Sequence, residues 1–66
     1  MPPPRSMRTV TFDEGIHETP IFWRDDLPAG VAFGGPAVVE QFDATTVVPP
    51  GARAEVDLWL NIVITV

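Results

Sequence analysis

The sequence contains no cysteine and no lysine. The absence of cysteine excludes a thiol nucleophile, a thiolate zinc site and a disulfide scaffold. It is also compatible with a reducing cytoplasm, which is where we expect the protein to reside. No apolar run approaches the roughly 18 residues that a membrane-spanning helix requires. The first six residues lack an apolar stretch, so we do not expect them to be a secretory signal.

Positive charge is scarce, because four arginines face nine acidic residues and leave a net charge of −5. Nucleic-acid binding needs a basic surface that releases counterions, and this composition does not supply one. Anionic membrane surfaces are disfavoured for the same reason. We therefore expect neither a nucleic acid nor a membrane among the partners, and we interpret the acidic balance as a contribution to solubility.

The chain is short, with 66 residues, which allows one domain at most. A domain of this size buries only about 60% of the surface that its unfolded form exposes. Marginal stability, or dependence on a partner, is therefore expected. A catalytic pocket needs several convergent polar groups, and the sequence offers few candidates. We accordingly do not expect the chain to be an enzyme by itself.

The chain divides into a short lead-in and one domain. Three consecutive prolines at positions 2–4 fix their own dihedral angles and donate no hydrogen bonds,. Residues 1–6 are therefore expected to be a disordered or polyproline-II lead-in, and residues 7–66 a single β-rich domain. Within residues 8–13, Val10 and Phe12 alternate with polar residues, which is typical of a half-buried strand,.

Short runs of β-branched and aromatic residues recur along the rest of the domain. They predict strands at residues 18–24, 37–40, 45–48, 52–57 and 61–66, and a brief one at 31–33,. Pro20 lacks an N–H group, so we expect it at a strand start or on a sheet edge. Eight prolines and five glycines oppose a helical domain,. The predicted fold class is all-β, a small barrel or sandwich of five to six short strands.

Few residues invite a chemical interpretation. His17, the only histidine, lies between Glu14 and Glu18, and Asp25 and Asp26 form an acidic pair that could contact a hard cation,. One histidine with two carboxylates does not make a specific metal site, and an acidic pair without an EF-hand pattern does not either. We expect a solvated loop and a solvated turn. No catalytic, cofactor-binding or metal-ligating residue is assigned, and no cofactor is expected.

The tripeptide Leu58-Trp59-Leu60 is unusual because it lies in the predicted connection between the last two strands. Hairpin connections normally contain residues such as Asn-Gly or Asp-Gly. Two interpretations stay open. The three side chains either fold back onto a small core, or they form a contact patch for a partner, where aromatic residues are enriched.

Several motifs in this order resemble a known family. Residues 35–41 are Gly-Pro-Ala-Val-Val-Glu-Gln, and residues 43–51 are Asp-Ala-Thr-Thr-Val-Val-Pro-Pro-Gly. Together with residues 8–13, 19–27 and 53–57, they are similar to the far C-terminal part of the hydantoinase A/5-oxoprolinase family. The resemblance covers most of the chain. One departure is that family members commonly place a glycine-asparagine turn before the last strand, whereas here Asn61 follows Leu60.

The resemblance implies a large ATP-dependent parent enzyme that opens cyclic amides such as hydantoins or 5-oxoproline, with related subunits in ketone carboxylases. It places the ATP chemistry in an actin-like N-terminal domain of several hundred residues, so no catalytic or nucleotide-binding residue is transferred to this chain. What it implies here is a structural or subunit-contact role. The expected partner is the catalytic domain or subunit of a hydantoinase-like enzyme, or a second copy of the chain. The alternative is a free-standing protein-interaction module that uses an exposed Leu58-Trp59-Leu60 patch.

Overall fold

The computed structural model describes residues 1–66 as seven strands and one short 3-10 turn. The strands are β1 (Ser6–Phe12), β2 (Gly15–Trp23), β3 (Ala32–Gly34), β4 (Ala37–Gln41), β5 (Ala44–Val48), β6 (Arg53–Val56) and β7 (Ile62–Thr65). The 3-10 turn η1 (Arg24–Asp26) follows β2 directly. The predicted all-β class is confirmed, with seven strands where five or six were expected.

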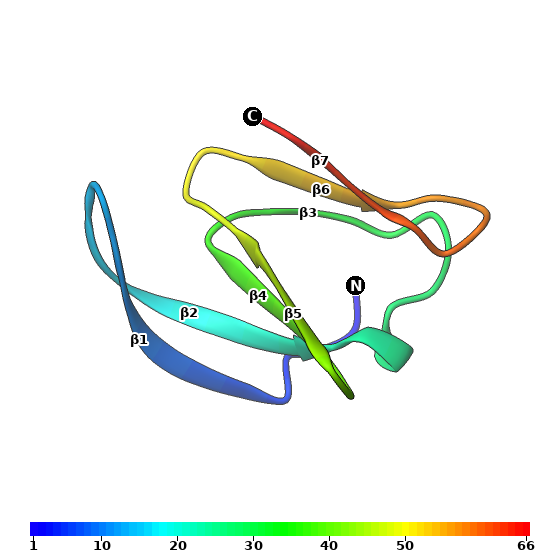
Figure 1. Cartoon of the computed structure of the whole chain (residues 1–66), viewed down its shortest axis with the longest axis horizontal. Coiled ribbons are helices and arrows are strands. Elements are labelled where there is room, and N and C mark those ends of the chain that lie inside the picture. Colours follow the sequence, from blue (N-terminus) through cyan, green and yellow to red (C-terminus); the bar gives the residue numbers. More distant parts are fainter.

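The strands form two sheets (Figure 1). The larger sheet has the order β1-β2-β4-β5, and the smaller one has the order β3-β6-β7. Hairpins join β1 to β2, β4 to β5 and β6 to β7, whereas β2 and β4 run parallel, with Ile21 opposite Val38. The chain between that parallel pair passes through η1 and then through β3 of the other sheet. The two sheets are therefore interleaved along the sequence.

The core lies between the two sheets and is small. Only eleven of the 66 residues are buried. Protein interiors are close-packed, so each of these residues matters for the stability of the core. Val39 and Val48 from the larger sheet face Val56 from the smaller sheet, and all three are almost fully buried. Phe22 and Phe33 add an aromatic contact between the sheets, with ring centroids 5.5 Å apart,. A core of this size is consistent with the limited burial expected from the length of the chain.

The period-2 pattern of the first strand is confirmed. Val10 and Phe12 are half-buried, while the residues between and beside them are exposed. Pro20 was expected at a strand start or on an edge, and it lies instead in the middle of β2, opposite Met7. Its missing N–H is tolerated because β4 pairs with β2 only from Ile21 onward, so that one side of β2 is open at Pro20,.

The lead-in meets the domain at Arg5 and Ser6. The strand β1 begins at Ser6, and the backbone N–H of Arg5 donates a hydrogen bond to the carbonyl of Ile21 at 2.8 Å. The Arg5 guanidinium pairs with Asp26 of η1, with 2.7 Å between Nε and Oδ2. The disorder expected for residues 1–6 stays a prediction.

Gly35 marks a close approach between two chain segments. A Cβ atom at this position would lie 1.9 Å from the carbonyl oxygen of Pro49, which is far inside contact distance. The N–H of Gly35 donates to the carbonyl of Ala52 at 2.9 Å, so the segment after β5 is held against the chain that enters β4. The structure contains no helix long and apolar enough to cross a membrane.

Candidate functional site

The Leu58-Trp59-Leu60 segment forms the loop between β6 and β7, as the sequence predicted. Asp57 closes this loop, because its Oδ1 accepts hydrogen bonds from the N–H of Trp59 at 2.9 Å and from that of Asn61 at 2.8 Å. Main-chain bonds from Leu60 to Asp57 and from Asp57 to Asn61 complete the closure. A three-residue hairpin loop of this kind usually ends with a residue in the left-handed conformation, and Leu60 has a φ of 63°,. The loop is therefore closed by side-chain and main-chain bonds despite lacking glycine.

The loop presents apolar surface to solvent. Leu58 is 81% exposed and Trp59 is 79% exposed, so neither packs on the core, while Leu60 is 54% exposed. The sequence left two interpretations open. The first, in which the side chains fold back onto the core, is wrong for Leu58 and Trp59 because both are exposed. The role of these residues as a partner contact stays a prediction.

The electrostatics of the loop centre on Asp57. Hydrogen bonds from the backbone N–H of Asn61 and Trp59 favour the charged carboxylate and lower its pKa below the ordinary value, against partial desolvation,. The side-chain amide of Asn61 and the positive charge of Arg24 act in the same direction. The negatively charged carboxylate of Asp57 therefore stabilises the loop by accepting these hydrogen bonds.

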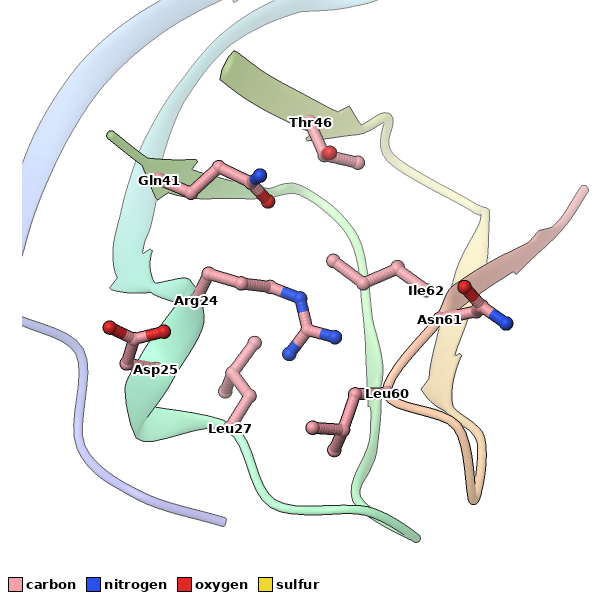
Figure 2. A pocket seen from close by; sticks show the side chains of 8 residues that line it. All are labelled: Arg24, Asp25, Leu27, Gln41, Thr46, Leu60, Asn61 and Ile62. Carbon is pink, nitrogen blue, oxygen red and sulfur yellow. The ribbon is translucent and has the colours of Figure 1, made fainter. Parts of the chain in front are cut away.

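A pocket of about 590 Å³ opens beside this loop, between the ends of the two sheets (Figure 2). Leu27, Leu60 and Ile62 supply its apolar surface, whereas Gln41 and Thr46 supply polar groups from the larger sheet. The remaining lining residues are Arg24, Asp25 and Asn61. The sandwich is open at this end because Gln41 and Thr46 occupy positions on the inner face where a closed core would have apolar side chains.

Arg24 extends into this pocket. Figure 2 shows its guanidinium directed toward the space between Leu27, Leu60 and Ile62, while the carboxylate of Asp25 points away from it. Arg24 is half-buried, and its guanidinium makes no hydrogen bond and no salt bridge within the chain. The pocket therefore holds a guanidinium whose hydrogen-bond donors have no partner in this chain.

Phe42 adds a second exposed aromatic residue near the pocket. It occupies the two-residue turn between β4 and β5, directly after the pocket residue Gln41, and is 97% exposed. In Figure 1 this turn, η1 and the β6–β7 loop lie at the same end of the molecule, opposite the β1–β2 turn. Sequence reasoning missed Phe42, although a large aromatic residue in a predicted tight turn is the same signal that singled out Trp59.

The other candidates from the sequence lie elsewhere. The solvated loop expected for His17 is wrong, because His17 lies half-buried in β2, with its ring 5.8 Å from that of Phe12 in an edge-to-face contact. Asp26 is engaged by Arg5, and hydrogen bonding to that guanidinium lowers its pKa from the ordinary value. No three His, Cys, Asp or Glu side chains lie close enough together to hold a metal ion.

The fold and this surface define a small β-sandwich domain with an open end that is lined by both polar and apolar residues. Its sequence matches the family described as the hydantoinase/oxoprolinase C-terminal domain over residues 3–63, and the chain belongs to that family. The chain is 52% identical over 58 residues to an uncharacterized protein of Methanocaldococcus jannaschii, a match that covers 88% of this chain. It spans only 8% of that relative's length. No solved structure matches it.

Proposed function

We propose that the chain serves as a C-terminal docking domain of an ATP-dependent hydantoinase or oxoprolinase, with a structural or subunit-contact role and no catalysis of its own. The single observation that carries this proposal is its membership of a family of C-terminal domains, together with its 8% share of a much longer relative. The partner is the catalytic domain or subunit of such an enzyme. The cytoplasm is the compartment that fits an ATP-dependent, cysteine-free protein.

The proposed contact residues are Leu58, Trp59 and Leu60. Large exposed apolar side chains clustered on one loop are uncommon on a small domain unless another surface covers them. The loop is also held by the hydrogen bonds of Asp57, so that little conformational entropy is lost when it is covered,. Phe42, in the β4–β5 turn, is a further exposed aromatic residue.

The test is complementation. The chain is mixed with a hydantoinase-family enzyme from which the matching segment has been removed, and ATP-dependent hydrolysis of hydantoin or 5-oxoproline is measured. We expect the mixture to regain activity and the chain alone to have none. ATP-dependent amide hydrolysis by the purified chain alone would contradict the proposal, as would a folded chain that neither binds the truncated enzyme nor restores it.

Trp59→Ser is the informative variant, and Ile16→Ser is its matched control. Ile16 is also an exposed apolar residue, 70% accessible, but it lies by the β1–β2 turn at the opposite end of the domain. We expect Trp59→Ser to weaken binding at least tenfold, as hot-spot aromatic residues do, and Ile16→Ser to leave it unchanged. If both variants weaken binding equally, the Leu58-Trp59-Leu60 loop is not part of the contact.

A second candidate function is a free-standing protein-interaction module that uses the same Leu58-Trp59-Leu60 patch. The exposure of Leu58 and Trp59 favours it as much as it favours docking. The two are distinguished by the partner. The interaction module is supported, and the docking domain is contradicted, if the chain self-associates, does not bind the truncated enzyme, and loses self-association in the Trp59→Ser variant.

A further inference from the structure

We infer that the open end of the sandwich binds an acidic side chain from the body of the enzyme, which pairs with Arg24 inside the pocket. This inference rests on the proposed docking function and specifies the chemistry of the contact. It begins with the unpaired charge. Arg24 is half-buried, and its guanidinium forms no hydrogen bond and no salt bridge within the chain. A partly desolvated guanidinium without a partner is unfavourable, and a carboxylate offers it two parallel hydrogen bonds.

The carboxylates of this chain do not fill that role. The positive charge of Arg24 helps to lower the pKa of Asp57, but the oxygens of Asp57 already accept hydrogen bonds from Trp59 and Asn61 and make none with the guanidinium. Asp26 is paired with Arg5, and Asp25 points away from the guanidinium. Although the chain carries a net charge of −5, none of its carboxylates forms a salt bridge with the Arg24 guanidinium, which leaves the donors of that group open to an external carboxylate.

The surroundings of Arg24 indicate a protein segment as the source of that carboxylate. Leu27, Leu60 and Ile62 surround the guanidinium with apolar surface, and Gln41 and Thr46 offer hydrogen-bonding groups on the opposite wall (Figure 2). The exposed Phe42 and Trp59 lie in the two loops at this end. Arginine and aromatic residues are the types enriched at the centre of specific protein interfaces.

The occupant we assign is part of the polypeptide that surrounds this domain in its longer relatives. The Methanocaldococcus jannaschii relative is matched over only 8% of its length, so most of such a protein lies outside the domain. An acidic side chain on that larger body, flanked by apolar residues, complements both the charge and the walls of the pocket.

The experiment measures binding of the chain to the Methanocaldococcus jannaschii relative from which the matching segment has been removed, by isothermal titration calorimetry. Arg24→Met removes the charge and keeps an apolar stem. Arg24→Lys keeps the charge and removes the planar, two-pronged geometry. Arg53→Met is the matched control, because Arg53 is exposed on β6 and makes no ion pair. Circular dichroism verifies that each variant is folded.

We expect Arg24→Met to raise the Kd about 10- to 100-fold, which is the usual effect of losing a charge-assisted pair. Arg24→Lys should give a smaller increase, and Arg53→Met should leave the Kd within about twofold of the original value. High salt should weaken the binding of the original chain more than the binding of Arg24→Met, because salt screens the charge interaction that only the original chain makes.

Three results overturn the inference. If Arg24→Met binds with the same Kd as the original chain, the proposed contact between Arg24 and a carboxylate is wrong, while the docking function is still supported. Failure of the original chain to bind at all removes the docking function and the inference with it. Self-association of the chain that Arg24→Met abolishes assigns the pocket to a second copy instead of the enzyme body.

Discussion

The carboxylate of Asp57 accepts a hydrogen bond from the backbone N–H of Asn61 at 2.8 Å, which fixes the two ends of an apolar loop. Between them, the side chains of Leu58 and Trp59 are largely exposed, whereas Leu60 lines the neighbouring pocket. Loops of this length normally use glycine for the last turn residue, and this one uses Leu60 with a positive φ,. The network around Asp57 thus maintains a backbone conformation that the local sequence disfavours.

Replacing Leu60 with glycine should stabilise the isolated chain. A leucine in the left-handed region costs about 1 kcal/mol or more, and glycine does not carry that cost. We expect the free energy of unfolding, measured by urea denaturation, to rise by about 1 kcal/mol. Leu58→Gly is the control, because Leu58 has no positive φ. It should lower stability by about 0.5–1 kcal/mol, and equal effects of the two variants would argue against strain at Leu60.

Gly35→Ala should be severely destabilising. The added Cβ would clash with the carbonyl oxygen of Pro49, which is a backbone atom and cannot rotate away as a flexible side chain could. We expect a loss of about 3 kcal/mol or more in the free energy of unfolding, enough to unfold a domain with so small a core. Gly34→Ala is the matched control, because its nearest neighbour, the Ala52 carbonyl oxygen, is 3.9 Å away. A stable Gly35→Ala variant would show that the two segments do not approach this closely.

The stability of the last hairpin should depend on pH through Asp57. Its pKa is lowered in the folded chain, first by the backbone hydrogen bond from Asn61. A lowered pKa contributes stability that is present above the unfolded value of about 3.9 and is lost as the pH falls through the folded value. We expect the carboxyl carbon of Asp57 to titrate below that value in an NMR experiment. Asp57→Asn retains an acceptor oxygen and should lose this part of the pH dependence, and an unchanged pH profile would contradict the assignment.

Arg5→Met should release the lead-in and raise the pKa of Asp26 toward its ordinary value. The hydrogen bond from Arg5 is the main cause of the lowered pKa, and the same bond ties residue 5 to η1. NMR titration of Asp26 and backbone relaxation of residues 1–6 measure the two effects together. Arg8→Met, which removes a different ion pair with Glu40, should change neither. An unchanged Asp26 in the Arg5 variant would show that this exposed pair does not persist in solution.

Much of the fold could be predicted from the sequence, because a strand shows a local pattern of alternating or β-branched residues. The alternation of Val10 and Phe12, and the β-branched runs at residues 45–48 and 61–66, located strands that the structure contains. The parallel pairing of Ile21 with Val38 was not accessible, since a period-2 pattern identifies the buried face of a strand but not its neighbour,. Pro20 was misplaced for the same reason, because whether it sits on an open edge depends on where β4 begins.

The candidate site was only partly accessible. Leu58-Trp59-Leu60 stood out because three large apolar residues contradict the chemistry of a turn, and the family resemblance indicated the domain to which they belong. Arg24 did not stand out, because an arginine after a strand is ordinary. Its significance arises only when the fold brings it beside Leu60 and Ile62, which follow it by more than thirty residues.

The parallel pair β2–β4 has a kinetic consequence. Its two strands can meet only after a long loop has closed, and that loop contains β3, whose partner β6 lies still further along the chain. Such non-local pairing slows the search for the native state, and all-β domains of this kind fold on the scale of milliseconds to seconds. Because β3 has no strand partner until β6 is available, a chain emerging from a ribosome can complete the smaller sheet, and with it the core between the sheets, only after β6 and β7 have emerged.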